Sequence, residues 1–235
     1  MSSFIPHLHS DLRTARETRR GATATPESVP RGVHKTYPRM EQIKLPSPEK
    51  LSLSLTEALE QRTSHLGVGK SGVLSMDILS TLLGNALKKR DSSLHRNYPS
   101  GGGLYPIETY IITNTLNESI PSVFHYNPTL HVLEKLWAIP EEIPLKELIV
   151  QKDIPPFSTI IIFTSVWKRS SAKYGDFTYM LALLEAGHMS ENLLLVSTAL
   201  GLHSRPVAGF DDSMINKLLD LDPLLEQPIY SVIIS

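Results

Sequence analysis

Residues 173–201 read KYGDFTYMLALLEAGHMSENLLLVSTALG. The stretch predicts the longest helix of the chain over 177–200, with apolar side chains on nearly all sides. Gly201 follows at the position where a left-handed residue commonly closes a helix. A helix this apolar is typically central and packs against a sheet or another subunit. The fold is therefore expected to be built around it.

Composition and charge remove several classes of protein. The chain has 235 residues, 41% hydrophobic and 20% charged, as in a soluble protein with a buried core. Its formal charge of -1 argues against a general nucleic-acid binder. The lack of cysteine excludes disulfides, Cys-ligated zinc and a Cys nucleophile, and the histidines show no zinc-binding spacing. No apolar run is long enough to span a bilayer, and the N-terminus has no hydrophobic segment like that of a signal peptide. A cytoplasmic protein that binds neither a metal nor a membrane is therefore expected.

Apolar periodicity predicts further elements on both sides of the long helix. Helical spacing predicts helices at 51–62, 75–89 and 212–219. Runs rich in β-branched residues predict strands at 107–113, 123–126, 159–164 and 228–234, the third with the composition of a strand buried on both faces. The chain is therefore expected to be an α+β layer protein.

The first 49 residues differ from the rest. They are basic over 1–39 and carry no sustained apolar period. They predict an extended N-terminal arm that lies on the body or a partner, ahead of one domain at 50–235. A basic arm for an acidic peptide or nucleic acid is the alternative interpretation.

Four stretches carry a signal for ligand binding. Arg62-Thr63-Ser64 sets a guanidinium beside two hydroxyls, which suits a phosphate. YPSGGGLYP at 98–106 has three glycines, which let the backbone approach a flat ligand and offer it N–H donors. The others are Lys173-Tyr174-Gly175 with LLEAGH at 183–188, and PVAGF at 206–210. Alone, each also fits a solvated helix end or an ordinary loop.

In their order along the chain and in their residues, these stretches resemble the FMN-dependent nitroreductase-like superfamily over about residues 51–234. YPSGGGLYPIE at 98–108 and KYGDFTYMLALLEAGHMSENL at 173–193 are most similar to its SagB-type dehydrogenases, which oxidise azolines to thiazoles and oxazoles in modified peptides. The resemblance implies a three-layer α+β fold, with a mostly antiparallel central sheet flanked by long helices in an intertwined homodimer. It also implies bound FMN, an azoline-containing peptide or carrier-bound substrate, and a cyclodehydratase complex as a partner.

The resemblance assigns flavin contacts to three groups of residues. The FMN phosphate and ribityl chain are assigned to Arg62 and Ser64. The backbone near flavin N5 is assigned to Ala208 and Gly209. A loop that reaches the flavin from the partner subunit corresponds to Pro99, Ser100, Gly101 and Gly103.

The chain also departs from the family pattern at the phosphate. Many relatives carry a second basic residue where this chain has Leu66, and basic residues after the last strand, where this chain stops at Ser235. Phosphate binding is therefore expected to depend on Arg62, with Arg205 as a substitute.

The resemblance assigns the chemistry to Lys173 and Tyr174. Azoline oxidation removes a proton α to a carbonyl and a hydride from the neighbouring ring carbon, and flavin N5 is the natural hydride acceptor. Lys173 is the base if its pKa is lowered toward neutrality; otherwise Tyr174 is, with Lys173 stabilising the phenolate. Glu185 and His188 are interpreted as packing and hydrogen-bonding residues.

Two other functions stay open at this point. One is an NAD(P)H-dependent nitro- or quinone-reductase of the same fold. The other is a flavin-poor scaffold subunit of a peptide-modifying complex.

Overall fold

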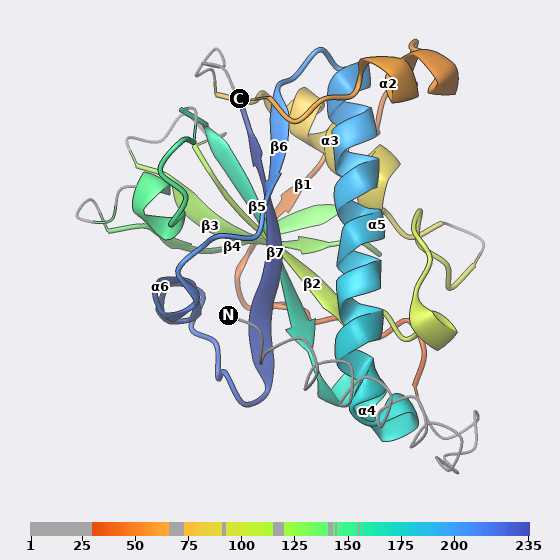
Figure 1. Cartoon of the computed structure of the whole chain (residues 1–235), viewed down its shortest axis with the longest axis vertical. Helices are drawn as coiled ribbons and strands as arrows, with labels where there is room; N and C mark the ends of the chain where they lie inside the picture. Colours follow the sequence, from red (N-terminus) through yellow and green to blue (C-terminus); the bar gives the residue numbers. More distant parts are fainter. Residues whose placement is uncertain are drawn as a thin grey trace, which may run out of the picture.

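A computed structural model of the chain describes residues 30–65, 73–90, 93–114, 120–140, 143, 145–154 and 156–235. The first 29 residues of the expected arm and Leu66 lie outside these ranges. Within them, one seven-stranded sheet organises the fold in the order β1-β4-β3-β2-β5-β7-β6 (Figure 1). All paired strands are antiparallel. The strands are β1 (Glu41–Lys44), β2 (Ile107–Thr113), β3 (Ser122–Asn127), β4 (Val132–Ala138), β5 (Thr159–Val166), β6 (Ser204–Val207) and β7 (Glu226–Ile234).

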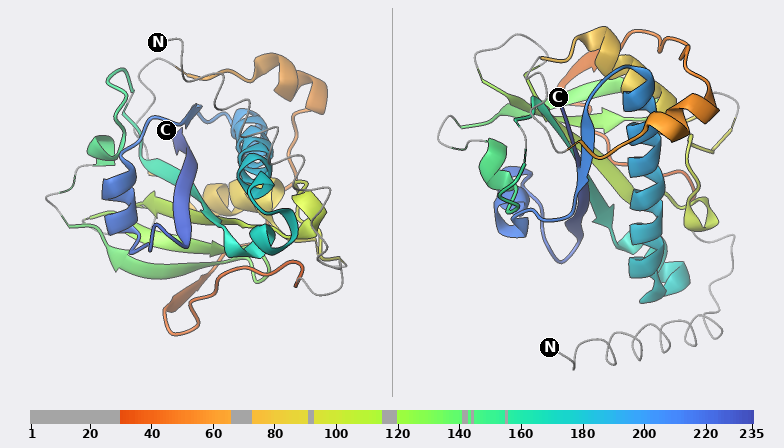
Figure 2. Two further views of the ribbon diagram at one scale, coloured as in Figure 1. Left: turned by 60° about the horizontal axis from the view of Figure 1, so that its bottom comes forward. Right: turned by 45° about the horizontal axis from the view of Figure 1, so that its top comes forward.

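Helices cover both faces of the sheet (Figures 1 and 2). One face carries α2 (Leu55–Gln61), α3 (Met76–Leu87) and α5 (Phe177–Ala199), of which α3 and α5 are the two longest helices described. The opposite face carries α6 (Asp212–Leu218) and the short η4 (Leu145–Leu148). Two short elements lie near the N-terminal end of α5, namely η3 (Gly101–Gly103) and α4 (Lys168–Tyr174). The expected three-layer α+β fold with an antiparallel central sheet is therefore confirmed. Within the described ranges, no helix combines the length and apolarity needed to cross a membrane.

Strand alternation divides the core into two clusters. On β2, Ile107 and Ile111 pack with α3 and α5, whereas Tyr110 and Ile112 pack with α6 and η4. The first seven residues of β5 are all buried, as its run of β-branched residues predicts. The long helix ends as predicted, because Gly201 has φ +68° and allows Leu202 N–H to bond the Ser197 carbonyl at 2.9 Å.

Three strands and one helix were not predicted from the sequence. β1 has four residues, three of them exposed, and pairs only with β4 at the sheet edge. Residues 41–44, expected as part of the arm, therefore belong to the sheet. β4 was missed because its sequence, VLEKLWA, places a glutamate among apolar residues. The helix α4 is short and has no side-chain N-cap, which leaves little sequence signal.

Glu134, the glutamate of β4, belongs to a buried row of charged residues on the α6 side of the sheet, together with His125 and Glu108. The ring of His125 lies between two carboxylates, with Nδ1 2.7 Å from Glu134 and Nε2 2.9 Å from Glu108. Carboxylates only accept, so both ring nitrogens donate and the imidazole is protonated. Burial opposes this charge, but hydrogen bonds to the two carboxylates raise the pKa of His125 above its usual 6.5.

We expect the stability supplied by His125 to depend on pH. Because its folded-state pKa is raised, its contribution is complete below about 6.5 and is lost as pH rises through the raised value. His125→Gln should lower the free energy of unfolding by about 3–5 kcal/mol at pH 6, because it leaves a buried pair incomplete. Urea unfolding of both proteins from pH 6 to 9 measures this. A wild-type advantage that stays constant over that range would contradict the protonated imidazole.

Candidate active site

The glycine loop, residues 100–105, is held in one conformation by a serine and a buried glutamate. Gly102 has φ +65° and Tyr105, although not glycine, has φ +50°. The Ser100 hydroxyl accepts a bond from Tyr105 N–H at 2.9 Å and donates to Glu185 at 2.5 Å. A non-glycine residue with positive φ persists only where its surroundings fix it, so these bonds define the loop.

The glutamate that holds this loop is buried on α5. Glu185 is 2% exposed, and burial raises its pKa to about 8 despite the hydrogen bond from Ser100. It is therefore mostly protonated at neutral pH. Its interpretation as a hydrogen-bonding residue is confirmed. By contrast, His188 is exposed one turn further along α5.

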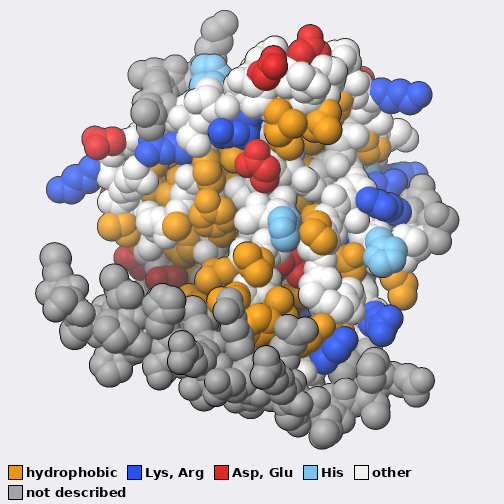
Figure 3. Space-filling model, turned by 45° about the vertical axis from the view of Figure 1, so that its right-hand side comes forward, with side chains coloured by type: hydrophobic (Ala, Val, Ile, Leu, Met, Phe, Trp, Pro, Cys, Tyr) orange, Lys and Arg blue, Asp and Glu red, His pale blue; other side chains and the backbone are white. Residues whose placement is uncertain are grey.

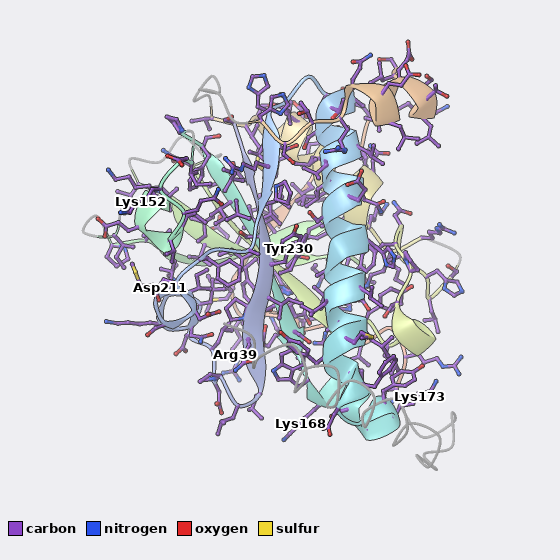
Figure 4. The ribbon with its side chains drawn as sticks, in the orientation of Figure 1. Arg39, Lys152, Lys168, Lys173, Asp211 and Tyr230 are labelled. Carbon is purple, nitrogen blue, oxygen red and sulfur yellow. The ribbon has the colours of Figure 1, made fainter. Side chains whose placement is uncertain are left out.

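The structure brings Lys173 and Tyr174 onto the glycine loop. A Cβ built on Gly102 would lie 2.6 Å from Tyr174 Oη and 2.9 Å from Lys173 Nζ. The same Nζ lies 5.1 Å from the centre of the Tyr174 ring. Figure 4 shows Lys173 at the lower end of the molecule, on α4. Two polar side-chain ends therefore meet over a backbone position that has no room for a side chain.

The residues assigned to the flavin phosphate lie elsewhere, beside β6. Arg62 caps the C-terminal end of α2, and its Nε lies 3.5 Å from the half-exposed Glu191. Ser64 is exposed. His65 N–H bonds the Ser204 carbonyl at 3.2 Å and thereby ties this segment to the start of β6.

The other end of β6 carries Ala208 and Gly209. Both are exposed. Ala208 lines a hollow of about 400 Å³ together with Tyr179 and Leu183 of α5. The hollow therefore lies between the end of β6 and α5.

Helix α5 separates these two groups of residues. Leu181 faces the glycine loop, because a Cβ on Gly101 would lie 3.2 Å from its side chain. Tyr179 and Leu183 are each two residues away, about 200° around the helix, and face the hollow by Ala208. Within one chain, the glycine loop thus lies with Lys173 and Tyr174 on one side of α5. Ala208 and Gly209 lie toward the other, and α2, which ends before Arg62, lies near the C-terminal end of α5, away from α4 (Figure 1).

Two predicted residues remain, Arg205 of β6 and Pro99, which precedes the glycine loop. Arg205 Nη1 donates to the Asp153 carbonyl at 3.0 Å, so its guanidinium is engaged by the loop before β5. Pro99 is exposed beside the glycine loop.

Sequence reasoning missed three residues next to the site. Tyr230 of β7 lies between that strand and α5 (Figure 4), where burial and the charge of Glu191 raise its pKa. Glu108 and Arg169 form an ion pair behind the glycine loop. Only Glu108 had a sequence signal, because a charged residue inside a largely apolar predicted strand indicates a buried ionic partner.

Comparisons with known proteins identify the family of this chain. The family model described as "Nitroreductase family" matches residues 59–234. The microcin B17-processing protein McbC of Escherichia coli is 30% identical over 188 residues, covering 76% of this chain and 68% of McbC. The trifolitoxin-processing protein TfxB of Rhizobium leguminosarum bv. trifolii is 26% identical, covering 88% of this chain and 60% of TfxB.

Solved structures give the same fold. A chain of the E. coli microcin synthetase McbBCD complex with truncated pro-MccB17 superposes with a TM-score of 0.64 at 26% identity, covering 80% of this chain and 75% of that one. A protein of Ralstonia eutropha JMP134 superposes with a TM-score of 0.71 at 23% identity, covering 88% and 93%. The family match extends over most of the sheet, α5 and the groups on both sides of it. The chain belongs to the nitroreductase family.

Proposed function

We propose that this protein is an FMN-dependent dehydrogenase that oxidises azoline rings to thiazoles or oxazoles in a peptide or carrier-bound precursor. One observation carries the proposal, namely the meeting of Lys173 Nζ and Tyr174 Oη over Gly102. Two relatives are named for processing microcin B17 and trifolitoxin, which supports a peptide substrate.

The residues present fit FMN. Among the described residues, the Arg62 guanidinium pairs with a half-exposed carboxylate at 3.5 Å, and Ser64 beside it is exposed, so both are available to a phosphate. Ala208 and Gly209 offer exposed backbone. At Gly102, the space that a Cβ would fill is occupied by the ends of Lys173 and Tyr174, which places these two side chains on the glycine loop. When bound, FMN supplies the hydride acceptor.

The chain itself supplies the proton transfer and its geometry. Lys173 and Tyr174 lie where one of them can take the proton from the carbon α to the carbonyl. Lys173 Nζ lies 5.1 Å from the centre of the Tyr174 ring, and the ends of both side chains lie over Gly102. Both assignments of the base are compatible with the arrangement. The glycine loop orients the pair, because its own conformation is fixed by Ser100 and Tyr105.

The separation of the two groups by α5 favours a homodimer. We propose that the glycine loop, Lys173 and Tyr174 of one subunit complete a site with Arg62, Ala208 and Gly209 of the other. Helix α5 offers apolar surface for such contact, since Leu183 and Leu184 are exposed there. Figure 3 shows hydrophobic side chains gathered on this side of the molecule. A monomer in light scattering that still bound FMN tightly would contradict the shared site.

We also propose a cyclodehydratase complex as the partner that delivers the substrate. Its support is the likeness to a chain of the McbBCD synthetase complex. Co-purification of the tagged protein with a co-expressed cyclodehydratase tests this proposal, and failure of the two proteins to co-purify would contradict it.

We expect Arg62→Ala to weaken FMN binding. Loss of one charge-assisted contact, worth about 1.5–3 kcal/mol, corresponds to an affinity about 10–150 times lower. Arg39→Ala is the matched control, because Arg39 is exposed and lies on the segment before β1 (Figure 4). The visible absorption of protein purified at equal FMN concentration measures occupancy. Full flavin in the Arg62 variant would remove the phosphate role of this arginine.

A further inference from the structure

Arg169 links the helix that carries Lys173 and Tyr174 to the body of the protein. Helix α4 has seven residues and no side-chain N-cap, so it has little stability of its own. Arg169 lies one turn before Lys173 on the same face. Its Nη1 donates to the Tyr105 carbonyl at 3.1 Å, and its Nη2 pairs with Glu108. One guanidinium thus binds the end of the glycine loop and a core carboxylate together.

The carboxylate that receives Arg169 is a rigid anchor. Glu108 is 1% exposed on β2. Burial alone would raise its pKa, but His125 and Arg169 hold the pKa of Glu108 well below its usual range. Lys35 N–H also donates to it at 2.6 Å, so the segment before β1 meets α4 at the same carboxylate. Buried, ionised and bonded from three sides, Glu108 has little freedom to move.

The second acceptor of Arg169 is a strained part of the loop. Tyr105 has φ +50°, its N–H is held by Ser100, and its hydroxyl accepts a bond from Arg96 N–H at 3.0 Å. Arg169 holds the carbonyl of the same residue. All polar groups of Tyr105 are therefore fixed, and the last of them is fixed by α4.

We propose that Arg169 is a positioning residue, which locks α4 to the glycine loop so that Lys173 Nζ and Tyr174 Oη stay over Gly102. The effect that we expect on the reaction rate rests on the proposed function, whereas the docking of α4 does not. A fork-shaped guanidinium can hold two acceptors in fixed directions, whereas one ammonium cannot hold both in the same geometry. Arg169→Lys should therefore keep the charge beside Glu108 but release the loop.

A double-mutant cycle tests whether Arg169 acts through Lys173. We expect Arg169→Met to lower single-turnover flavin reduction by an azoline peptide by about 10–100-fold, since a misplacement of about 1 Å can cost that much. Flavin content should stay unchanged. The rate of Arg169→Lys should lie between the rates of wild type and Arg169→Met. In a Lys173→Ala background, the same Arg169→Met change should cost less than about threefold. Full additivity of the two substitutions would overturn the proposal, as would a wild-type rate in Arg169→Met.

Hydrogen–deuterium exchange gives a readout that does not need azoline oxidation. Amides of residues 168–175 should exchange about tenfold or more faster in Arg169→Met than in wild type, with the exchange in β5 unchanged. Lys168→Met is the matched control, because Lys168 is exposed on the same helix and carries the same charge (Figure 4). If wild type oxidises no azoline, the proposed function fails while this measurement still tests the docking. Equal exchange of α4 in the Arg169 and Lys168 variants would overturn the positioning role. If Arg169→Met does not fold, Arg169→Lys takes its place in both measurements.

Discussion

Lys173→Ala should lower the rate of flavin reduction by an azoline peptide by about 10²–10⁴-fold, the usual contribution of a proton-transfer group. The protein should stay folded and keep its FMN, because Lys173 is half-buried on a short helix and is not one of the residues assigned to hold the flavin. A residue that transfers a proton changes the rate, whereas a residue that holds the cofactor changes occupancy. Tyr174→Phe should lower the rate in the same way while keeping the ring.

Lys168→Ala is the control for this comparison. It removes the same charge from the same helix at an exposed position. The measurement is single-turnover flavin reduction with occupancy checked by absorption. Equal rates for wild type and Lys173→Ala would exclude the catalytic role and favour a reductase or a scaffold.

Gly102→Ala should lower the same rate by about 10–100-fold through displacement of the reactive atoms. The new Cβ would lie 2.6 Å from Tyr174 Oη and 2.9 Å from Lys173 Nζ, so both side-chain ends must move. Because these are the ends of flexible side chains, the free energy of unfolding should fall mainly by the left-handed backbone cost of about 1–2 kcal/mol.

Gly201→Ala separates the backbone cost from the displacement. Gly201 has φ +68°, against +65° for Gly102, and a Cβ there meets nothing within 4 Å. We expect both variants to lose similar stability and only Gly102→Ala to lose rate. A comparable loss of rate in both would show that general strain, and not the position of Lys173 and Tyr174, causes the effect.

Much of the layer structure could be predicted from local pattern. The long helix, its closing glycine and the buried run of β5 each have a strong local cause in apolar spacing or backbone freedom. β1 and β6 could not be predicted in this way, because each has four residues and forms only by pairing with a longer strand. β4 was hidden by Glu134, whose burial makes sense only once His125 lies opposite.

The residues of the candidate site were predictable, but their grouping was not. Gly102, Lys173 and Tyr174 lie in two segments about 70 residues apart, and only tertiary packing shows that they meet. The sequence likewise gave no sign that α5 would separate them from Arg62 and Ala208. The role of Arg169 has no local sequence signal, because it depends on Glu108 in a different strand.

The central claim is that azoline oxidation passes through the bound flavin with Lys173 and Tyr174 as the proton-transfer pair. Anaerobic mixing of the FMN-loaded protein with an azoline peptide tests it most directly, with absorption and peptide mass followed together. We expect the visible flavin band to bleach in step with the loss of two hydrogens from the peptide. We also expect NAD(P)H to bleach the band more slowly. Bleaching by NAD(P)H without any change in the azoline peptide would contradict the account, as would a purified protein that takes up no FMN.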